Sequence, residues 1–133
     1  MFKAGRHVVL VEDAPDTLEL FGMMLGNDYE ITQCSSCADA LTVVQRTTPD
    51  ILLMDIGMFD MDGVECLRQI RALPGLQDIP AIAVTAFAFP ADRKRCYDAG
   101  FQEFIAKPIL DYEEMRRLIE DVLNRRQTNS GKA

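Results

Sequence analysis

Short apolar runs alternate along this chain with stretches whose apolar residues recur every three or four positions. Most of the short runs are rich in Val, Ile and Leu, which is typical of strands buried on both faces of a parallel sheet. They predict five strands, over residues 7–11, 30–34, 50–54, 81–84 and 103–106.

The intervening stretches predict helices, and most of these carry an apolar stripe on one face. The residues of the stripes are Leu18, Phe21 and Leu25; Ala38, Leu41 and Val44; Val64, Leu67 and Ile70; and Met115, Leu118, Ile119 and Val122. A further helix within residues 87–100 has a thin stripe of Cys96 and Ala99, so its assignment depends on the residues at its ends.

Residues with known preferences for helix ends support these boundaries. Pro15 and Pro90 suit a first helical turn, and Gly100 suits a helix C-terminus. Ser36 and Asp111 each precede an acidic residue by three positions, as in a capping box.

Five strands that alternate with five helices predict an α/β fold, (βα)5, with parallel strands joined by right-handed crossovers. We expect a flavodoxin-like three-layer sandwich with a five-stranded sheet in the order 2-1-3-4-5 and functional residues at the carboxyl ends of the strands. The 133 residues fit one domain, which we place at residues 6–124. Residues 125–133 are polar and lack periodicity, so we expect a disordered tail there.

Charge and composition exclude some classes of protein. The 14 Lys and Arg against 21 Asp and Glu give a net charge of −7, and phosphate contacts need a basic surface, so direct nucleic-acid binding is not expected. Residues 1–66 hold 12 acids and 3 bases (net −9), whereas residues 67–133 hold 9 acids and 11 bases (net +2). No apolar run approaches the ~20 residues of a membrane span, and the N-terminus lacks the apolar segment of a secretory signal, so we expect a cytoplasmic protein without membrane contact.

In a cytoplasmic chain the four cysteines, Cys34, Cys37, Cys66 and Cys96, are expected to be reduced thiols. The spacing of Cys34 and Cys37 is compatible with zinc binding or redox chemistry. A zinc site needs further ligands, however, and the nearby candidate His7 lies within an apolar strand. We therefore interpret the cysteines as small buried hydrophobic residues.

Polar residues end or follow four of the predicted strands. Glu12 and Asp13 follow the first, Asp55 the third, Thr85 the fourth and Lys107 the fifth. Parallel strands place these positions along one edge of the sheet, where clustered carboxylates repel one another unless a cation lies between them. Mg²⁺ is the best candidate, because it prefers hard oxygen ligands.

With a cation in place, one carboxylate could act as a nucleophile toward phosphorus, as in aspartyl-phosphate chemistry. Asp55 is the candidate because it stands alone after the central strand, whereas Glu12 and Asp13 are paired and better suited to hold metal. The Lys107 ammonium and the Thr85 hydroxyl would then meet the charge that develops on the phosphoryl oxygens.

The chain resembles the receiver domains of two-component response regulators in four segments that fall on the predicted strand ends. These segments are Val9–Asp13, Leu53–Gly63, Val84–Ala86 and Ala106–Pro108. Each one is weakly specific alone, but four in the right order on the right strand ends are strongly specific, and the resemblance covers about residues 6–124.

The resemblance implies a role for each matching residue. Asp55 would accept a phosphoryl group from a phosphohistidine on a partner histidine kinase or phosphotransfer protein. Asp13, Asp55 and the backbone carbonyl of Gly57 would bind Mg²⁺ directly, and Glu12 would act mainly through metal-bound water. Lys107 would pair with a phosphoryl oxygen, and the Lys107–Pro108 peptide is a candidate cis bond.

The resemblance also implies a switch. Thr85 would move toward the phosphate, and Phe104 would occupy the aromatic switch position, although Phe104 could instead be a plain core residue. Phosphorylation would shift a two-state equilibrium and change the affinity of the face near Phe104 and the last two helices for a downstream protein. Homodimers through the fourth and fifth helices are common in the family. Such a protein catalyses only its own phosphorylation and dephosphorylation and is not otherwise an enzyme.

Two features of the chain depart from the family pattern. Phe59 stands where the family usually has proline, and loss of the fixed φ of proline predicts a looser loop beside Asp55, unless Phe59 packs against a partner. Phe87 and Gly57 flank the path of a hydrolytic water and cannot orient it with their side chains, which predicts a long-lived phosphate.

Two other functions stay open at this stage. A degenerate receiver that serves only as an interaction module would keep the fold without the chemistry, and Phe59 is the residue that motivates this alternative. A Mg²⁺-dependent phosphatase of the haloacid-dehalogenase type would carry its nucleophile on the first strand, with a second Asp two residues later. Here Asp55 follows the third strand, and Gly57 occupies the second position after it.

Overall fold

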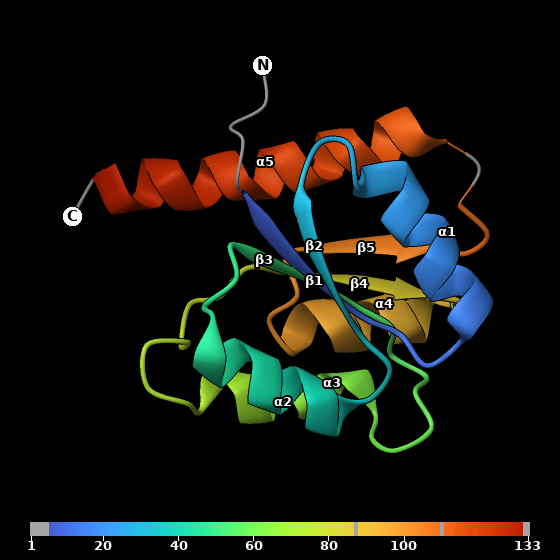
Figure 1. Cartoon of the computed structure of the whole chain (residues 1–133). Helices are drawn as coiled ribbons and strands as arrows, with labels where there is room; N and C mark the ends of the chain where they lie inside the picture. The colour runs from blue at the N-terminus through green and yellow to red at the C-terminus, as the bar shows by residue number, and fades with distance from the viewer. Residues whose placement is uncertain (1–5, 87, 110, 132–133) are drawn as a thin grey trace.

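The computed structural model describes residues 6–86, 88–109 and 111–131, with side chains as far as residue 125. Strands and helices alternate along the whole chain (Figure 1). The elements are β1 (His7–Val11), α1 (Pro15–Leu25), β2 (Glu30–Cys34), α2 (Cys37–Arg46), β3 (Ile51–Met54), α3 (Gly63–Arg71), β4 (Ala81–Thr85), α4 (Pro90–Asp98), β5 (Glu103–Ala106) and α5 (Tyr112–Gly131).

The strands form one parallel sheet in the order β2-β1-β3-β4-β5. The predicted fold class and strand order are therefore confirmed. The strand bounds agree with the apolar runs within one residue, since β3 begins at Ile51 and β4 extends to Thr85.

Helices cover both faces of the sheet, with α1 and α5 on one face and α2, α3 and α4 on the other (Figure 1). Successive side chains of a strand enter opposite cores. Val9 and Val11 of β1 pack on the α2–α3–α4 face, whereas Val8 and Leu10 pack on the α1–α5 face. Because both faces of β1, β3 and β4 are buried, these inner strands read as continuous apolar runs instead of alternating ones.

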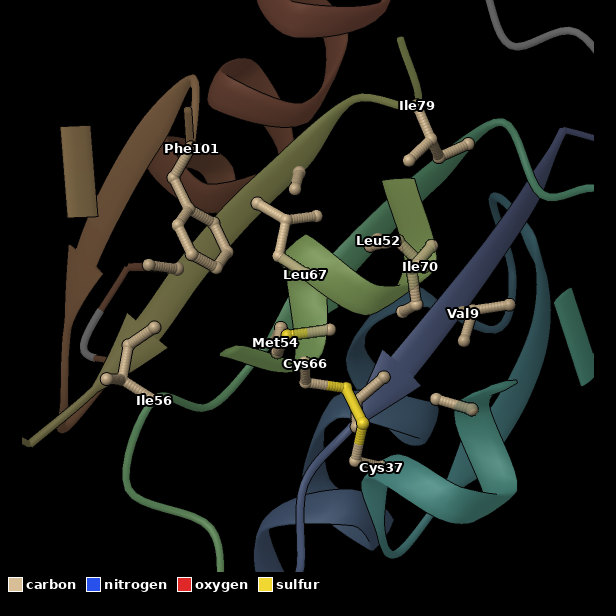
Figure 2. Close-up of a cluster of buried hydrophobic side chains, with 14 of the residues drawn as sticks. Val9, Cys37, Leu52, Met54, Ile56, Cys66, Leu67, Ile70, Ile79 and Phe101 are labelled. Atoms are coloured by element: carbon tan, nitrogen blue, oxygen red, sulfur yellow. A yellow bond between two sulfur atoms is a disulfide. The ribbon is translucent and has the colours of Figure 1, made fainter. Parts of the chain in front are cut away.

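The core on the α2–α3–α4 face contains a disulfide that the sequence analysis did not predict (Figure 2). It joins Cys37, the first residue of α2, to Cys66 of α3, and their Cα atoms lie 5.8 Å apart. The expectation of four reduced thiols is therefore wrong for this pair, while Cys34 and Cys96 are free and buried. The partners are 29 residues apart in sequence and meet because α2 and α3 pack side by side, which no local spacing reveals.

The helix ends follow the local signals that the sequence carries. Ser36 accepts a hydrogen bond from the Asp39 N–H (3.1 Å), as an N-cap residue does. Asp111 likewise accepts one from the Glu114 N–H (3.2 Å). Gly100, which follows α4, has a φ of 101°, a conformation that favours glycine.

The C-terminal helix extends beyond residue 124, the predicted end of the domain. α5 continues to Gly131, through most of the stretch for which we expected a disordered tail, and residues 132–133 lie outside the described part of the chain. The stretch lacks apolar periodicity, but Arg and Gln have good helix propensity and an exposed helical turn needs no apolar stripe. Within the described residues, no helix is long and apolar enough to cross a membrane.

Candidate functional site

The candidate site lies where β1, β3, β4 and β5 end. Backbone hydrogen bonds continue the sheet by one residue beyond the strands: the Asp55 N–H donates to the Val11 carbonyl and the Lys107 N–H to the Thr85 carbonyl, each over 2.9 Å. Glu12 is held in the same way by the Cys34 carbonyl of β2 (2.9 Å). The rigid sheet therefore sets the spacing of the residues that follow it.

Three carboxylates meet at this edge. Glu12, Asp13 and Asp55 each offer an oxygen, and these oxygens all lie within 4.8 Å of one another. Glu12 and Asp55 are buried, with 3% and 8% of their surface exposed, and Asp13 is half-buried. The sequence analysis placed these three residues at one edge of the sheet, and the structure brings them together.

The Lys107 ammonium lies against two of the carboxylates. Its Nζ contacts Glu12 Oε1 and lies 3.4 Å from Asp55 Oδ2. Burial raises the pKa of Glu12 above its ordinary value, and the hydrogen bond from Lys107 opposes that shift. One half-buried ammonium against three carboxylates leaves the site with excess negative charge.

The backbone around Asp55 orients its side chain. The Gly57 N–H donates to Asp55 Oδ1 over 3.0 Å. Gly63, the first residue of α3, donates its N–H to the Ile56 carbonyl over 2.8 Å. A Cβ atom at Gly63 would lie 2.4 Å from the Asp55 carbonyl oxygen, so α3 can approach the site this closely only with glycine there.

The two residues expected to act as a switch are both buried. Thr85 has no exposed surface, and Phe104 has 6%. The guanidinium carbon of Arg93, from α4, lies 4.6 Å from the centre of the Phe104 ring in a cation–π contact. The Lys107–Pro108 peptide is cis, as the resemblance implied.

The donor set at this edge fits a small hard cation. Carboxylate oxygens are the ligands that Mg²⁺ prefers, and a divalent ion would offset the excess negative charge left by Lys107. Among the described residues this is the one group of three or more acids, histidines or cysteines close enough to hold a metal ion. A zinc site at Cys34 and Cys37 finds no support, because Cys37 is bonded to Cys66.

Contacts in the loop between β3 and α3 were missed by the sequence analysis. The Phe59 N–H donates to Asp13 Oδ2 over 2.6 Å, and the Asp60 carboxylate accepts the N–H groups of Cys37 (3.1 Å) and Ala38 (3.3 Å). A backbone donor exists at almost every position, so no sequence signal singles out Phe59. Phe87, the other departure from the family pattern, lies outside the described residues.

Comparison with known proteins identifies one family. The family described as "Response regulator receiver domain" matches residues 8–123. The histidine-protein kinase BarA of Escherichia coli K12 is 35% identical over 130 residues, which are 97% of this chain and 14% of that protein. The chain thus spans a small part of that kinase. The polar-differentiation response regulator DivK of Brucella ovis is 34% identical over 105 residues, 78% of this chain and 85% of that protein.

Solved structures agree with the sequence relatives. The receiver domain of the sensor histidine kinase PA1611 from Pseudomonas aeruginosa PAO1 superposes with a TM-score of 0.82 at 31% identity. The match covers 90% of this chain and 98% of that one, and that structure carries a magnesium ion in its active-site cleft.

Proposed function

Because the chain belongs to the response regulator receiver domain family of two-component systems, we propose that Asp55 accepts a phosphoryl group from a phosphohistidine of a histidine kinase or phosphotransfer protein. The observation that carries this proposal is the cluster of Glu12, Asp13 and Asp55 with Lys107 against it. Asp55 combines a carboxylate anchored by the Gly57 N–H with a place directly after the central strand of the sheet.

Receiver domains bind Mg²⁺ at an acidic pocket, and the acidic cluster of this chain fits that ion. Asp13, Asp55 and the backbone carbonyl of Gly57 would hold it directly, and Glu12 through water. The magnesium site of the related PA1611 receiver supports this assignment. The ion would supply positive charge next to the carboxylates and the transferred phosphoryl group.

In the transfer, an oxygen of the Asp55 carboxylate attacks phosphorus, and the bond between phosphorus and the imidazole nitrogen of the donor breaks. The imidazole leaves with the electron pair of that bond. The Lys107 ammonium, 3.4 Å from Asp55 Oδ2, is close enough to pair with an oxygen of the acquired phosphoryl group. The buried Thr85 hydroxyl and the Phe104 ring would then respond as the switch.

Receiver domains are generally not classical enzymes. In keeping with this, the proposed chemistry is limited to self-phosphorylation and hydrolysis of the Asp55 phosphate. Slow hydrolysis of the Asp55 phosphate stays a prediction from the sequence.

We place the protein in the cytoplasm, where its kinase partner would present the phosphohistidine. We also propose that the face formed by α4, β5 and α5 contacts a downstream protein or a second copy of the chain.

Phosphorylation by a small phosphodonor tests the proposal. Incubated with Mg²⁺ and acetyl phosphate, the wild-type protein should form an acid-stable, base-labile phosphoprotein, and Asp55→Asn should not. Asp16→Asn, a matched substitution on the exposed side of α1, should be phosphorylated like the wild type.

Two outcomes would contradict the proposal. Absence of an adduct on the folded wild-type protein would favour a degenerate receiver that serves as an interaction module. Hydrolysis of many phosphoester molecules per protein would favour a phosphatase with an aspartyl nucleophile.

A further inference from the structure

The Asp13 carboxylate is held by a backbone group that lies far from it in sequence. The Phe59 N–H donates to Asp13 Oδ2 over 2.6 Å, across 46 residues. Lys107 contacts Glu12 and Asp55 instead. In the described part of the chain, Phe59 therefore supplies the one hydrogen bond to the Asp13 side chain.

The side chain of Phe59 takes no part in this contact. It is 99% exposed, so the protein uses this residue through its backbone alone. Proline at this position would remove the N–H and with it the hydrogen bond.

The residues on both sides of Phe59 keep its N–H in place. Met58 is buried in the core of the α2–α3–α4 face, with 7% of its surface exposed. The Asp60 carboxylate accepts the N–H groups of Cys37 and Ala38 at the start of α2. With one neighbour packed and the other bonded to a helix end, the loop aims the Phe59 N–H at Asp13 without help from the Phe59 ring.

We infer that the Phe59 N–H is a positioning group for Asp13 as a metal ligand, an inference that rests on the proposed function. A hydrogen bond to one oxygen of a carboxylate restricts its rotation, and the Asp13 carboxylate still offers an oxygen to the cluster. Partners of this kind raise metal affinity, and their loss commonly weakens it by about 10- to 100-fold. The loop that follows Asp55 thereby orients Asp13, the candidate metal ligand that follows β1.

Calorimetric titration with Mg²⁺ separates the N–H from the ring. Phe59→Ala keeps the N–H and should bind Mg²⁺ like the wild type, whereas Phe59→Pro lacks it and should bind about tenfold more weakly. Urea unfolding of each variant without metal shows whether it is folded. Equal Mg²⁺ affinity of the folded alanine and proline variants would overturn the inference, as would tighter binding by Phe59→Pro.

Amide hydrogen exchange gives a second test that does not depend on the proline variant. In the wild-type protein the Phe59 amide should be protected, despite its fully exposed ring, and Asp13→Ala should abolish that protection. Free exchange of this amide in the wild type would overturn the inference by itself. Equal Mg²⁺ affinity of the folded Phe59→Ala and Phe59→Pro variants, alongside normal acetyl-phosphate labelling of the wild type, would overturn the inference and leave the proposed function intact, so the two ideas fail separately.

Discussion

Glu12 is the most deeply buried of the three acids at the sheet edge. Burial raises its pKa because a charged carboxylate loses solvation, and the contact with Lys107 recovers part of that cost. Lys107 also lies against Asp55, so a single ammonium compensates more than one carboxylate. The negative charge that is left over is the physical reason why this site would favour a cation.

Gly63 controls how closely α3 approaches Asp55, the proposed phosphoacceptor. An added Cβ would meet the Asp55 carbonyl oxygen at 2.4 Å and the Ile56 Cα at 2.8 Å, and neither backbone atom can turn away as a side chain would. The Asp62 carboxylate caps the same helix end by accepting the Val64 N–H over 2.8 Å. The Asp62-Gly63 pair thus combines a helix cap with a residue small enough for this packing.

Gly63→Ala should lower the free energy of unfolding by about 1–3 kcal/mol, because the helix or the Asp55 backbone must shift. The matched control is Gly22→Ala in α1, whose Cβ would meet only the movable end of the Gln33 side chain. Alanine has a higher helix propensity than glycine, so this control substitution should leave the free energy of unfolding unchanged or raise it slightly. Urea unfolding measures both, and a Gly63→Ala protein as stable as the wild type would show that the contact relaxes without cost.

At the scale of the elements, the loop between β3 and α3 connects the site to three helices. Asp60 bonds to the first turn of α2, and Asp62 caps α3 and pairs with Arg95 of α4, whose Nη2 lies 3.0 Å from Oδ1. The disulfide between Cys37 and Cys66 joins two of these helices directly (Figure 2). The loop that follows Asp55 therefore contacts all three helices of one face.

Because of the disulfide, we expect two reactive thiols instead of four. The measurement is a titration with a thiol reagent of protein that was purified in air and denatured without reductant. Closing a loop of 29 residues should stabilise the fold by about 3–4 kcal/mol. Dithiothreitol should thus lower the unfolding midpoint of the wild type.

The double variant Cys37→Ser, Cys66→Ser is the control for this experiment, since dithiothreitol should leave its unfolding midpoint unchanged. In the folded wild type, Cys34 should react slowly, because burial raises its pKa to about 11. Four reactive thiols in the denatured, unreduced protein would contradict the disulfide.

At the scale of the whole molecule, β5 connects the acidic cluster of Glu12, Asp13 and Asp55 with the face formed by α4, β5 and α5. Lys107 follows this strand and Phe104 lies within it, under the guanidinium of Arg93. Beside them a groove of ≈ 370 Å³ runs over β5 to α5, with Met115 and Leu118 in its lining. Several bases of the second half of the chain are paired, as Lys94 is with Asp98 and Arg125 with Glu103, so this face is less basic than its sequence suggests.

Activation should change the oligomeric state if the groove receives a second copy of the chain. Small-angle scattering with Mg²⁺ and beryllofluoride, which mimics an acyl phosphate, should show a larger particle than Mg²⁺ alone. Asp55→Asn should stay at the size of the unactivated protein under both conditions. An activated wild-type protein of unchanged size would argue that the face serves a different downstream protein.

The sequence by itself determined the fold and the composition of the site, since both follow from local signals. Buried apolar runs mark the strands, and parallel connectivity places the carboxyl ends of the strands along one edge of the sheet. The polar residues that follow these ends therefore gather there, as Glu12, Asp13, Asp55 and Lys107 do. Tertiary structure alone decided which groups meet across long separations: Cys37 with Cys66, Gly63 with the Asp55 backbone, and the Phe59 N–H with Asp13. Sequence analysis compared Phe59 with the proline that it replaces and predicted a looser loop or packing of Phe59 against a partner. In the folded chain, the Phe59 N–H holds a metal-ligand candidate. The physical reason is that periodicity reports which faces are buried, whereas the direction of a backbone donor is set only when helices and loops pack on the sheet.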